Sequence, residues 1–183
     1  MAFSISEIKS QLQFGGFRPT NFSVRIYNPA NSVADIKTQF MVQAAQVPSS
    51  TLGMVEVAYF GRRIKLAGDR QYDVWTVNVM NDEDFLVRNA LEHWSNEING
   101  AESNLRGFGG PQPSLYKSQA QVIQYSKSGD VLREYQFEGL WPLDVSAMDL
   151  DWNASDTIST FPVTFAYDSW RIVGGRTGDG GGV

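Results

Sequence analysis

The clearest hydrophobic pattern in the chain runs from a strand into a helix between residues 72 and 99. Apolar and polar side chains alternate from Tyr72 to Met80, which places Trp75, Val77 and Val79 on one face of a half-buried strand. The following segment changes to helical spacing, and its apolar stripe comprises Val87, Leu91, Trp94 and Ile98. These four residues are the predicted core face of a helix that packs against a sheet.

Polar residues mark both ends of this helix. Asn81 or Asp82 can cap it, because a short side-chain oxygen accepts hydrogen bonds from the first turn. Asp82, Glu83 and Asp84 place negative charge at the positive end of the helix dipole. Gly100 is typical of a helix stop, so the helix is predicted to follow the strand at once and to end near Asn99.

Alternation with a period of two residues predicts further strands along the chain. We expect them at residues 21–27, 36–45, 119–125, 131–138, 145–152 and 161–167, with Gly139-Leu-Trp-Pro142 ending the strand before it. A capping box from Ser4 to Glu7 predicts a short helix that reaches about Leu12. Few of the strands are spaced for a parallel crossover. The fold class is therefore mainly β: an antiparallel β-barrel or sandwich with one flanking α-helix.

The stretch from Met54 to Leu66 predicts a hairpin broken at Gly61, and it is unusually apolar and basic for a connection between strands. Two interpretations stay open: a solvated hairpin with one face on the core, or a surface that docks on another subunit. The candidate interface residues are Met54, Val55, Val57, Tyr59, Phe60, Arg62, Arg63 and Lys65. The N-terminal segment is a second candidate for contacts between subunits.

Composition favours one packed domain of the 183 residues, because 42% are hydrophobic and 13% aromatic. The expected domain spans residues 1–173 with an N-terminal extension at 1–20, and a flexible Gly-rich tail follows at 174–183. Apolar runs are too short for the ~20 residues of a membrane-spanning helix. The chain has no cysteine, which excludes disulfides and thiolate chemistry and fits a reducing cytoplasm. The net charge of −5 does not favour binding to nucleic acid.

No catalytic constellation is found in the sequence, and we expect neither a cofactor nor a metal. His93 is the single histidine and has no neighbouring nucleophile. The spacing of Asp149, Asp151 and Asn153 resembles the start of a calcium loop. Ala154 and Thr160 stand where that loop needs Gly and Glu, so the calcium interpretation is disfavoured.

Several short motifs resemble the tail tube proteins of contractile-tailed, T4-like bacteriophages. The resemblance is strongest at Trp75-Thr-Val77 and Val79-Met-Asn-Asp-Glu83. It extends to Ala67-Gly-Asp-Arg70 before them and to Gly139-Leu-Trp-Pro142 after them. Each motif is weak alone, but their order and spacing cover most of the chain.

The resemblance implies a tail-tube or Hcp-like β-barrel without catalytic activity. Six subunits of such proteins form a ring, and the rings stack into the hollow inner tube of the tail, through which DNA passes into the host without specific binding. Its implied partners are further copies of itself, the tail sheath protein, and baseplate and tail-terminator proteins. Its implied location is the virion tail, after synthesis in the host bacterial cytoplasm.

Two alternatives stay open at this stage. The nearer one is a tube subunit of a type VI or extracellular contractile injection system, which shares the fold. The more distant one is a ligand-binding β-sandwich that uses Trp, Tyr and Phe as stacking surfaces.

Overall fold

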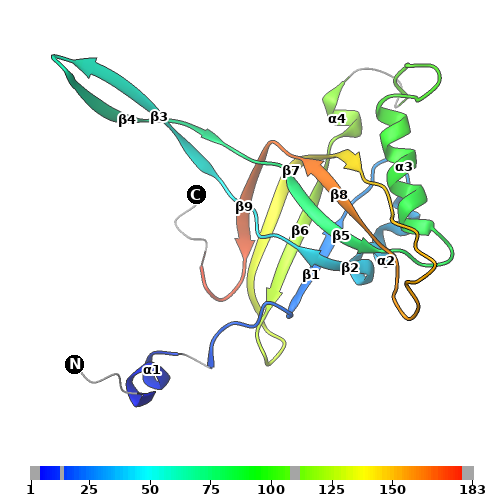
Figure 1. The fold of residues 1–183 in the computed structure, drawn as a ribbon, viewed down its shortest axis with the longest axis horizontal. Coiled ribbons are helices and arrows are strands. Elements are labelled where there is room, and N and C mark those ends of the chain that lie inside the picture. The colour runs from blue at the N-terminus through cyan, green and yellow to red at the C-terminus, as the bar shows by residue number, and fades with distance from the viewer. Residues whose placement is uncertain (1–4, 13–14, 108–111, 179–183) are drawn as a thin grey trace.

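The computed structural model of the chain describes residues 5–12, 15–107 and 112–178, which form a curved antiparallel sheet with helices packed against it (Figure 1). The main sheet has the strand order β1-β6-β7-β8-β5-β2, and β9 pairs with β7. A separate two-stranded sheet consists of β3 and β4. The antiparallel pairing confirms the predicted fold class. The strands are β1 (Phe22–Ile26), β2 (Val42–Ala45), β3 (Thr51–Tyr59), β4 (Arg62–Gln71), β5 (Trp75–Met80), β6 (Ser118–Tyr125), β7 (Val131–Val145), β8 (Thr160–Ala166) and β9 (Ser169–Gly174).

The core is centred on β5 and β8, whose inward faces are aligned by their register. Trp75 lies opposite Phe165, Val77 opposite Val163, and Val79 opposite Phe161, and all six side chains are buried. Trp75 also stacks on Phe137 of β7, with 4.4 Å between ring centroids. Burial of each such side chain contributes about 1.5–3 kcal/mol, so this strand pair is a main source of stability. The alternation predicted for 72–80 is confirmed over Trp75–Met80.

The main helix, α3 (Leu86–Ile98), covers this core. Val87, Leu91 and Trp94 are buried on its inner face, and Ile98 packs against the core from the end of the helix. The indole Nε1 of Trp94 donates a hydrogen bond of 2.9 Å to the carbonyl oxygen of Tyr116. The Trp94 ring is therefore held by apolar packing in the core and by a hydrogen bond at its indole N–H.

The predicted start of the helix at Asn81 or Asp82 is wrong, because α3 begins at Leu86. The carboxylates of Asp82 and Asp84 both bind the ammonium group of Lys37. Phe85 then adopts a left-handed backbone with φ of 52°, which interrupts the helical path before Leu86. Asp84 still serves the helix end, since its Oδ1 accepts a 3.0 Å hydrogen bond from the Leu86 N–H.

The predicted strand at residues 36–45 is also wrong over most of its length. A 3-10 turn, η2 (Ser32–Ala34), leads into the helix α2 (Asp35–Met41), and only Val42–Ala45 forms strand β2. The Asn31 side chain caps the turn by accepting from the Val33 N–H, and the Thr38 hydroxyl donates to the Ala34 carbonyl at 2.8 Å. α2 packs beside β1, so tertiary contact favours the helix over the weak alternation.

Asn28 joins the loop after β1 to α3 and is buried. Its Nδ2 donates to the Ala90 carbonyl at 2.9 Å, and its Oδ1 accepts from the backbone N–H groups of Ala30 and Asn31. One side chain therefore satisfies three polar groups between the sheet and the helix.

Strand β7 continues through Gly139-Leu-Trp-Pro142 to Val145, so the predicted strand end at this motif is wrong. Its first part pairs with β6 and β9, and its last part pairs with β8. Gly139 permits the change of direction, because its φ is 68° and the Asp168 side chain occupies the position of a Cβ. The strand predicted at 145–152 is wrong as well, since residues 146–159 form a loop between β7 and β8.

The described segments near the two ends of the chain differ in how they contact the body. The N-terminal helix α1 (Ile5–Gln11) has no buried residue, and Ser4 of its predicted capping box lies outside the described residues. The expected flexible tail begins inside β9, and the backbone N–H groups of Arg176 and Thr177 donate to Val131 and Leu132. Residues 179–183 lie outside the described part. A short helix, α4 (Pro113–Tyr116), precedes β6.

Candidate functional site

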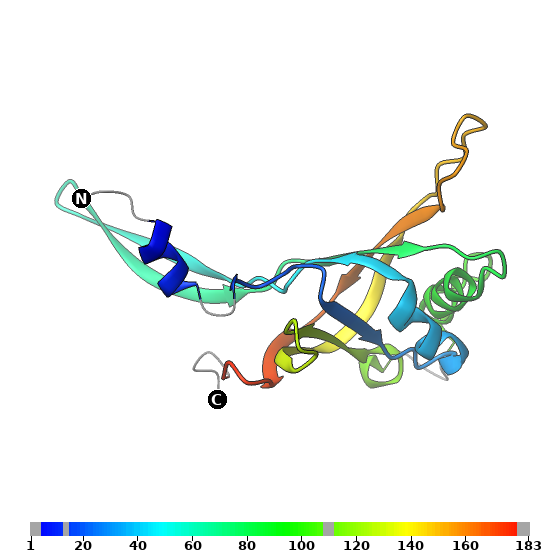
Figure 2. The ribbon, with the colours of Figure 1, turned by 90° about the horizontal axis from the view of Figure 1, so that it is seen from below.

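Strands β3 and β4 form a long hairpin that projects from the body (Figures 1 and 2). Their register pairs Tyr59 with Arg62, and it continues regularly down to Met54 opposite Ala67. The turn consists of Phe60 and Gly61, with φ angles of 44° and 77°. Two successive positive φ angles are typical of the tight hairpin turn whose twist matches the strands. The predicted break at Gly61 is therefore the tip of the hairpin.

The two faces of this hairpin differ in chemistry, because residues paired across an antiparallel ladder share a face. The apolar face carries five hydrophobic side chains: Val55, Val57, Tyr59, Ile64 and Leu66. The opposite, polar face carries Glu56, Ala58, Arg63 and Lys65, and the Arg63 guanidinium binds the Glu56 carboxylate at 3.0 Å. Every side chain named on the two faces is exposed, from 44% for Val57 to 65% for Tyr59 on the apolar face. Neither face packs on the core of its own chain.

The structure places four of the eight candidate interface residues on the apolar face, three on the polar face and one at the tip. Val55, Val57 and Tyr59 lie on the apolar face, where Arg62 extends the row toward the tip. Arg63 and Lys65 lie on the polar face, and Met54 lies there too. Phe60 stands at the tip, 89% exposed, with its ring edge-on to Tyr59 at 4.5 Å.

Sequence reasoning missed Ile64 and Leu66, which complete the apolar face. The signal was present in the alternation of Arg63, Ile64, Lys65 and Leu66. The register across the turn at Gly61 aligns this alternation with Val55 and Val57.

Close backbone approach and side-chain hydrogen bonds hold the base of the hairpin. Gly68 faces Gly53 across the ladder, and a Cβ on Gly68 would lie 3.0 Å from the Gly53 carbonyl carbon. This explains the glycine in the Ala67-Gly-Asp-Arg70 motif. The indole of Trp170 donates to the Ser49 carbonyl at 3.0 Å, and that of Trp75 donates to the Gln46 carbonyl at 2.8 Å. The direction of the hairpin is thus fixed by residues of the body.

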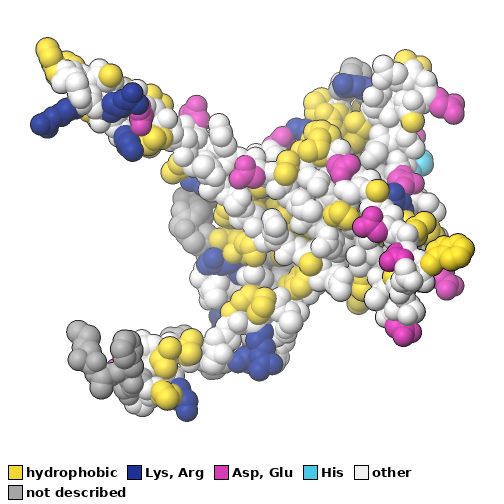
Figure 3. Space-filling model, viewed as in Figure 1, with side chains coloured by type: hydrophobic (Ala, Val, Ile, Leu, Met, Phe, Trp, Pro, Cys, Tyr) yellow, Lys and Arg dark blue, Asp and Glu magenta, His cyan; other side chains and the backbone are white. Residues whose placement is uncertain are grey.

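Charge is distributed unevenly over the molecule (Figure 3). Lys and Arg side chains gather on the left of this view, over the hairpin and the lower N-terminal segment, whereas Asp and Glu predominate on the right. The hairpin contributes Arg62, Arg63, Lys65 and Arg70. The right side includes the loop of residues 146–159, which carries Asp149, Asp151 and Asp156. The two ends of the subunit therefore have opposite charge.

The described residues offer no group of three His, Cys, Asp or Glu side chains that could hold a metal ion. His93 is exposed on α3, with its Nε2 at 3.9 Å from Glu97. Asp151, from the disfavoured calcium motif, accepts from the backbone and side chain of Asn153. Among the described helices, none is long and apolar enough to cross a membrane.

Five titratable side chains have pKa values that their surroundings shift. Hydrogen bonds from Lys37 lower the pKa of Asp82 and of Asp84, and the same bonds raise the pKa of Lys37. Burial raises the pKa of Asp35 and of the Tyr167 phenol. These groups belong to neither face of the hairpin.

Comparison with known proteins agrees with this arrangement. A sequence profile described as phage tail tube protein matches residues 17–173. The tail tube protein gp19 of Enterobacteria phage T4 is 33% identical over 169 residues, which cover 91% of this chain and 99% of the relative. A tail tube protein of Serratia phage KSP90 is 24% identical over 90% of this chain and 94% of the relative.

Solved structures show the same fold at lower sequence identity. The tube-terminating cap of the anti-feeding prophage superposes with a TM-score of 0.64 at 17% identity, covering 88% of this chain and 93% of that one. A chain of the sheath–tube complex of an extracellular contractile injection system gives a TM-score of 0.58 at 14% identity, covering 94% and 99%. The profile match spans nearly the whole chain, and the chain therefore belongs to the phage tail tube protein family.

Proposed function

We propose that six copies of this tail tube protein form a ring, and that the rings stack into the hollow inner tube through which phage DNA enters the host. The hairpin of β3 and β4 makes the contacts between rings. The observation that carries this proposal is the exposure of both hairpin faces, including the five side chains of the apolar face.

An isolated two-stranded hairpin is at best marginally stable in water, because it buries too little apolar surface to offset the ordering of its backbone. This hairpin also exposes a contiguous row of Val, Ile, Leu and Tyr side chains, which is typical of a protein interface. A second copy that covers the apolar face would supply the missing burial.

Strand edges support lateral association in the same way. In the described part of the chain, β1, β2 and β9 are each paired on one side only. An unpaired edge presents backbone N–H and C=O groups that favour pairing with another chain. In a ring, each subunit pairs its strand edges with those of its neighbours, and this lateral contact closes after six copies. The hairpin contact joins one ring to the next along the axis, where it can repeat without closing and so produces a tube.

The further partners follow from the family and its structural relatives. We propose contacts with the sheath, the baseplate and the tail terminator, since related chains come from a sheath–tube complex, a baseplate and a sheath/tube terminator. The net charge of −5 suits a lumen past which DNA moves without binding. The role is structural and without catalysis, and the protein is made in the host cytoplasm.

A second candidate is the tube of a contractile injection system, and the fold similarity to such tubes is the observation that favours it. The phage role has more support, because 33% identity to a phage protein covers nearly the whole of both chains. The ligand-binding sandwich has less support, because five large aromatic side chains of the sheet and the main helix are buried in the core and cannot stack on a ligand: Trp75, Trp94, Phe137, Phe161 and Phe165.

Negative-stain electron microscopy of the purified protein at rising concentration tests the proposal. We expect sixfold rings and hollow tubes, either spontaneously or after addition of baseplate-bearing tail fragments as nuclei. A protein that stays monomeric under both conditions would contradict the proposal.

A further inference from the structure

The loop of residues 146–159 projects from the body on the side away from the hairpin (orange in Figure 2). Every side chain from Asp149 to Ile158 is exposed. Trp152 shows its complete surface to solvent, and Leu150 is 87% exposed beside it. Asp149, Asp151 and Asp156 are the charged residues of the loop, which has no cation. The loop thus presents a large aromatic side chain among carboxylates.

Local hydrogen bonds give this loop a defined shape. The Ser146 N–H donates to Pro162 at the start of the loop, and the Ser159 carbonyl accepts from Asn81 at its end. In between, Asp151 Oδ1 accepts from the Asn153 N–H at 2.9 Å, and the Ala154 N–H donates to the Asp151 carbonyl at 3.1 Å. The turn at Asp151 therefore fixes the backbone around Trp152, whose side chain is fully exposed.

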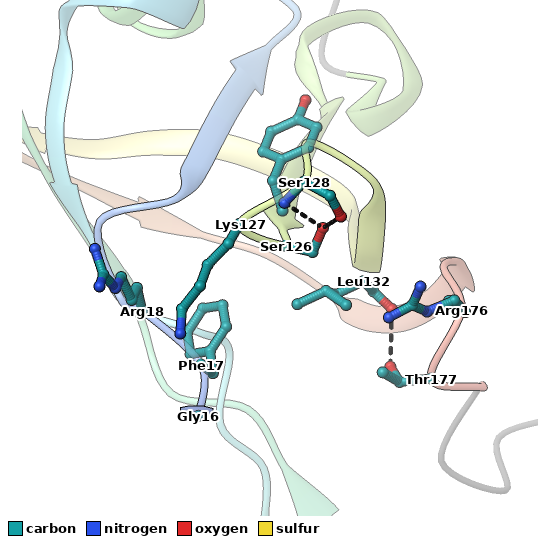
Figure 4. Close-up of a pocket in the computed structure, with 10 residues that line it drawn as sticks. Gly16, Phe17, Arg18, Ser126, Lys127, Ser128, Leu132, Arg176 and Thr177 are labelled. Atoms are coloured by element: carbon teal, nitrogen blue, oxygen red, sulfur yellow. Dashed lines mark hydrogen bonds between the residues drawn. The ribbon is translucent and has the colours of Figure 1, made fainter. Parts of the chain in front are cut away.

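A cavity of about 660 Å³ lies on the other side of the molecule, between the segment before β1, the turn from β6 to β7, and the end of β9 (Figure 4). Its apolar lining comes from Phe17, Tyr125 and Leu132. Its basic lining comes from Arg18, Lys127 and Arg176. A volume of this size accommodates a tryptophan side chain with its neighbours.

The described residues that line the cavity include three basic side chains and no acidic one. Lys127 donates to the Gly15 carbonyl at 3.3 Å, which ties the N-terminal segment to the turn. The Asp130 carboxylate lies 3.8 Å from Arg176 and also accepts a hydrogen bond from the Ser128 hydroxyl. A lining whose described charged residues are all basic favours an acidic segment as its occupant.

We propose that this cavity receives the loop of a second copy of the chain, with Trp152 seated against Phe17 and Leu132 and with Asp149 and Asp151 facing Arg18 and Lys127. The inference rests on the proposed self-assembly and names the contact that performs part of it. The loop and the segments that line the cavity lie on opposite sides of the subunit in both ribbon views. The contact is therefore head-to-tail and can close a ring or extend a stack.

The tip of the hairpin is a poorer occupant for the same cavity. Phe60 is exposed there too, but Arg62 and Arg63 follow it after Gly61. These cations would face Arg18 and Lys127, and like charges brought together at an interface oppose association. Charge therefore selects the acidic loop.

The absence of cysteine from the chain permits a direct test by cross-linking. The variant Ala154→Cys with Ser128→Cys places one thiol beside Trp152 and the other at the rim of the cavity. The matched control combines Ala154→Cys with Ser114→Cys, because Ser114 is exposed on α4, remote from the cavity. Mild oxidation of assembled protein should give a ladder of disulfide-linked oligomers for the first pair and not for the control.

Rings or tubes without this ladder would overturn the inference while leaving the proposed function intact. A protein that forms neither rings nor tubes, even with tail fragments as nuclei, would overturn both. Trp152→Ala supplies an independent measure, because loss of a central tryptophan anchor weakens association by roughly 30-fold or more. Its melting temperature should stay unchanged, since the side chain makes no core contact. Unchanged association of this variant would also overturn the inference.

The charge component has its own test by reversal. Asp151→Lys should weaken association because it places a cation against the basic rim. Combining it with Lys127→Asp should restore association, and a double variant that remains as weak as the single ones would count against the proposed pairing.

Discussion

Replacing Val57 by aspartate should prevent the subunits from stacking while each subunit stays folded. Val57 lies on the apolar face of the hairpin, opposite Ile64, and 44% of its surface is exposed in the single chain. The hairpin forms its own two-stranded sheet outside the hydrophobic core. A charge at this position therefore affects contacts between copies more than it affects the free energy of unfolding.

The size of the effect follows from the exposure of the apolar face. Full burial of a Val, Ile or Leu side chain is worth about 1.5–3 kcal/mol. The five side chains are each about half exposed, so covering them gives about 1 kcal/mol each and about 5 kcal/mol per hairpin as an upper limit. Aspartate removes one such contribution and adds several kcal/mol for desolvating a carboxylate. The equilibrium constant for stacking should fall by more than about 100-fold.

Ala58→Asp is the matched control for this variant. It adds the same charge one residue away, but on the polar face and directly opposite Arg63. Sedimentation velocity and electron microscopy should show tubes for Ala58→Asp and single rings or monomers for Val57→Asp, with similar circular dichroism melts for both. Equal stacking of the two variants, or equal loss in both, would refute the assignment of the apolar face as the contact.

Three further predictions concern the body of the subunit. Trp94→Asp should unfold it, because a buried ring worth about 3–5 kcal/mol is replaced by a buried carboxylate; Trp94→Phe should remain folded in a thermal melt. Asn28→Ala should lower the free energy of unfolding by about 2 kcal/mol in urea titration, since three hydrogen bonds are lost; an unchanged midpoint would contradict this. The lowered pKa of Asp84 means that its bond to Lys37 stabilises the fold above the unfolded value of 3.8 and is lost as the pH falls below it. Asp84→Asn should therefore flatten the acid side of the stability curve, and an identical pH profile would count against the ion pair.

The sequence was most informative where one period extended over a complete element. Trp75, Val77 and Val79 alternate without interruption, and their strand is found where it was predicted. The helix pattern through Val87 and Leu91 was equally regular, because a helix on a core must keep one face apolar.

The predictions of secondary structure were wrong where contacts between residues distant in sequence decide the local conformation. Residues 35–41 have a short pattern that suits strand or helix, and packing beside β1 together with the bond from Lys37 to Asp82 selects the helix. Lys37 also binds Asp84, so the carboxylates of Asp82 and Asp84 that were expected to begin α3 face Lys37 instead. Gly139 suggested a strand end, but positive φ at that glycine lets β7 turn and continue.

The hairpin was predicted from the sequence, but the composition of its two faces was not, for the same reason. Runs of apolar residues identified the hairpin, whereas membership of a face depends on the register across the turn, which added Ile64 and Leu66 and moved Met54 to the other side. The acidic loop was predicted as a strand, because Leu150 and Trp152 alternate with polar residues as core positions of a strand do. A sequence pattern does not show whether such side chains are buried, and both are exposed.

The way the hairpin joins the body has a mechanical consequence. β2 leads into β3 and β4 leads into β5 through short connections, and the indoles of Trp75 and Trp170 fasten one of these connections to the core. A sideways load on the tip would therefore pass as torque through these connections to β5 and β9. In a stacked tube each hairpin would bridge the junction between two rings. The bending stiffness of the tube would then depend on the connections that join the hairpin to the body.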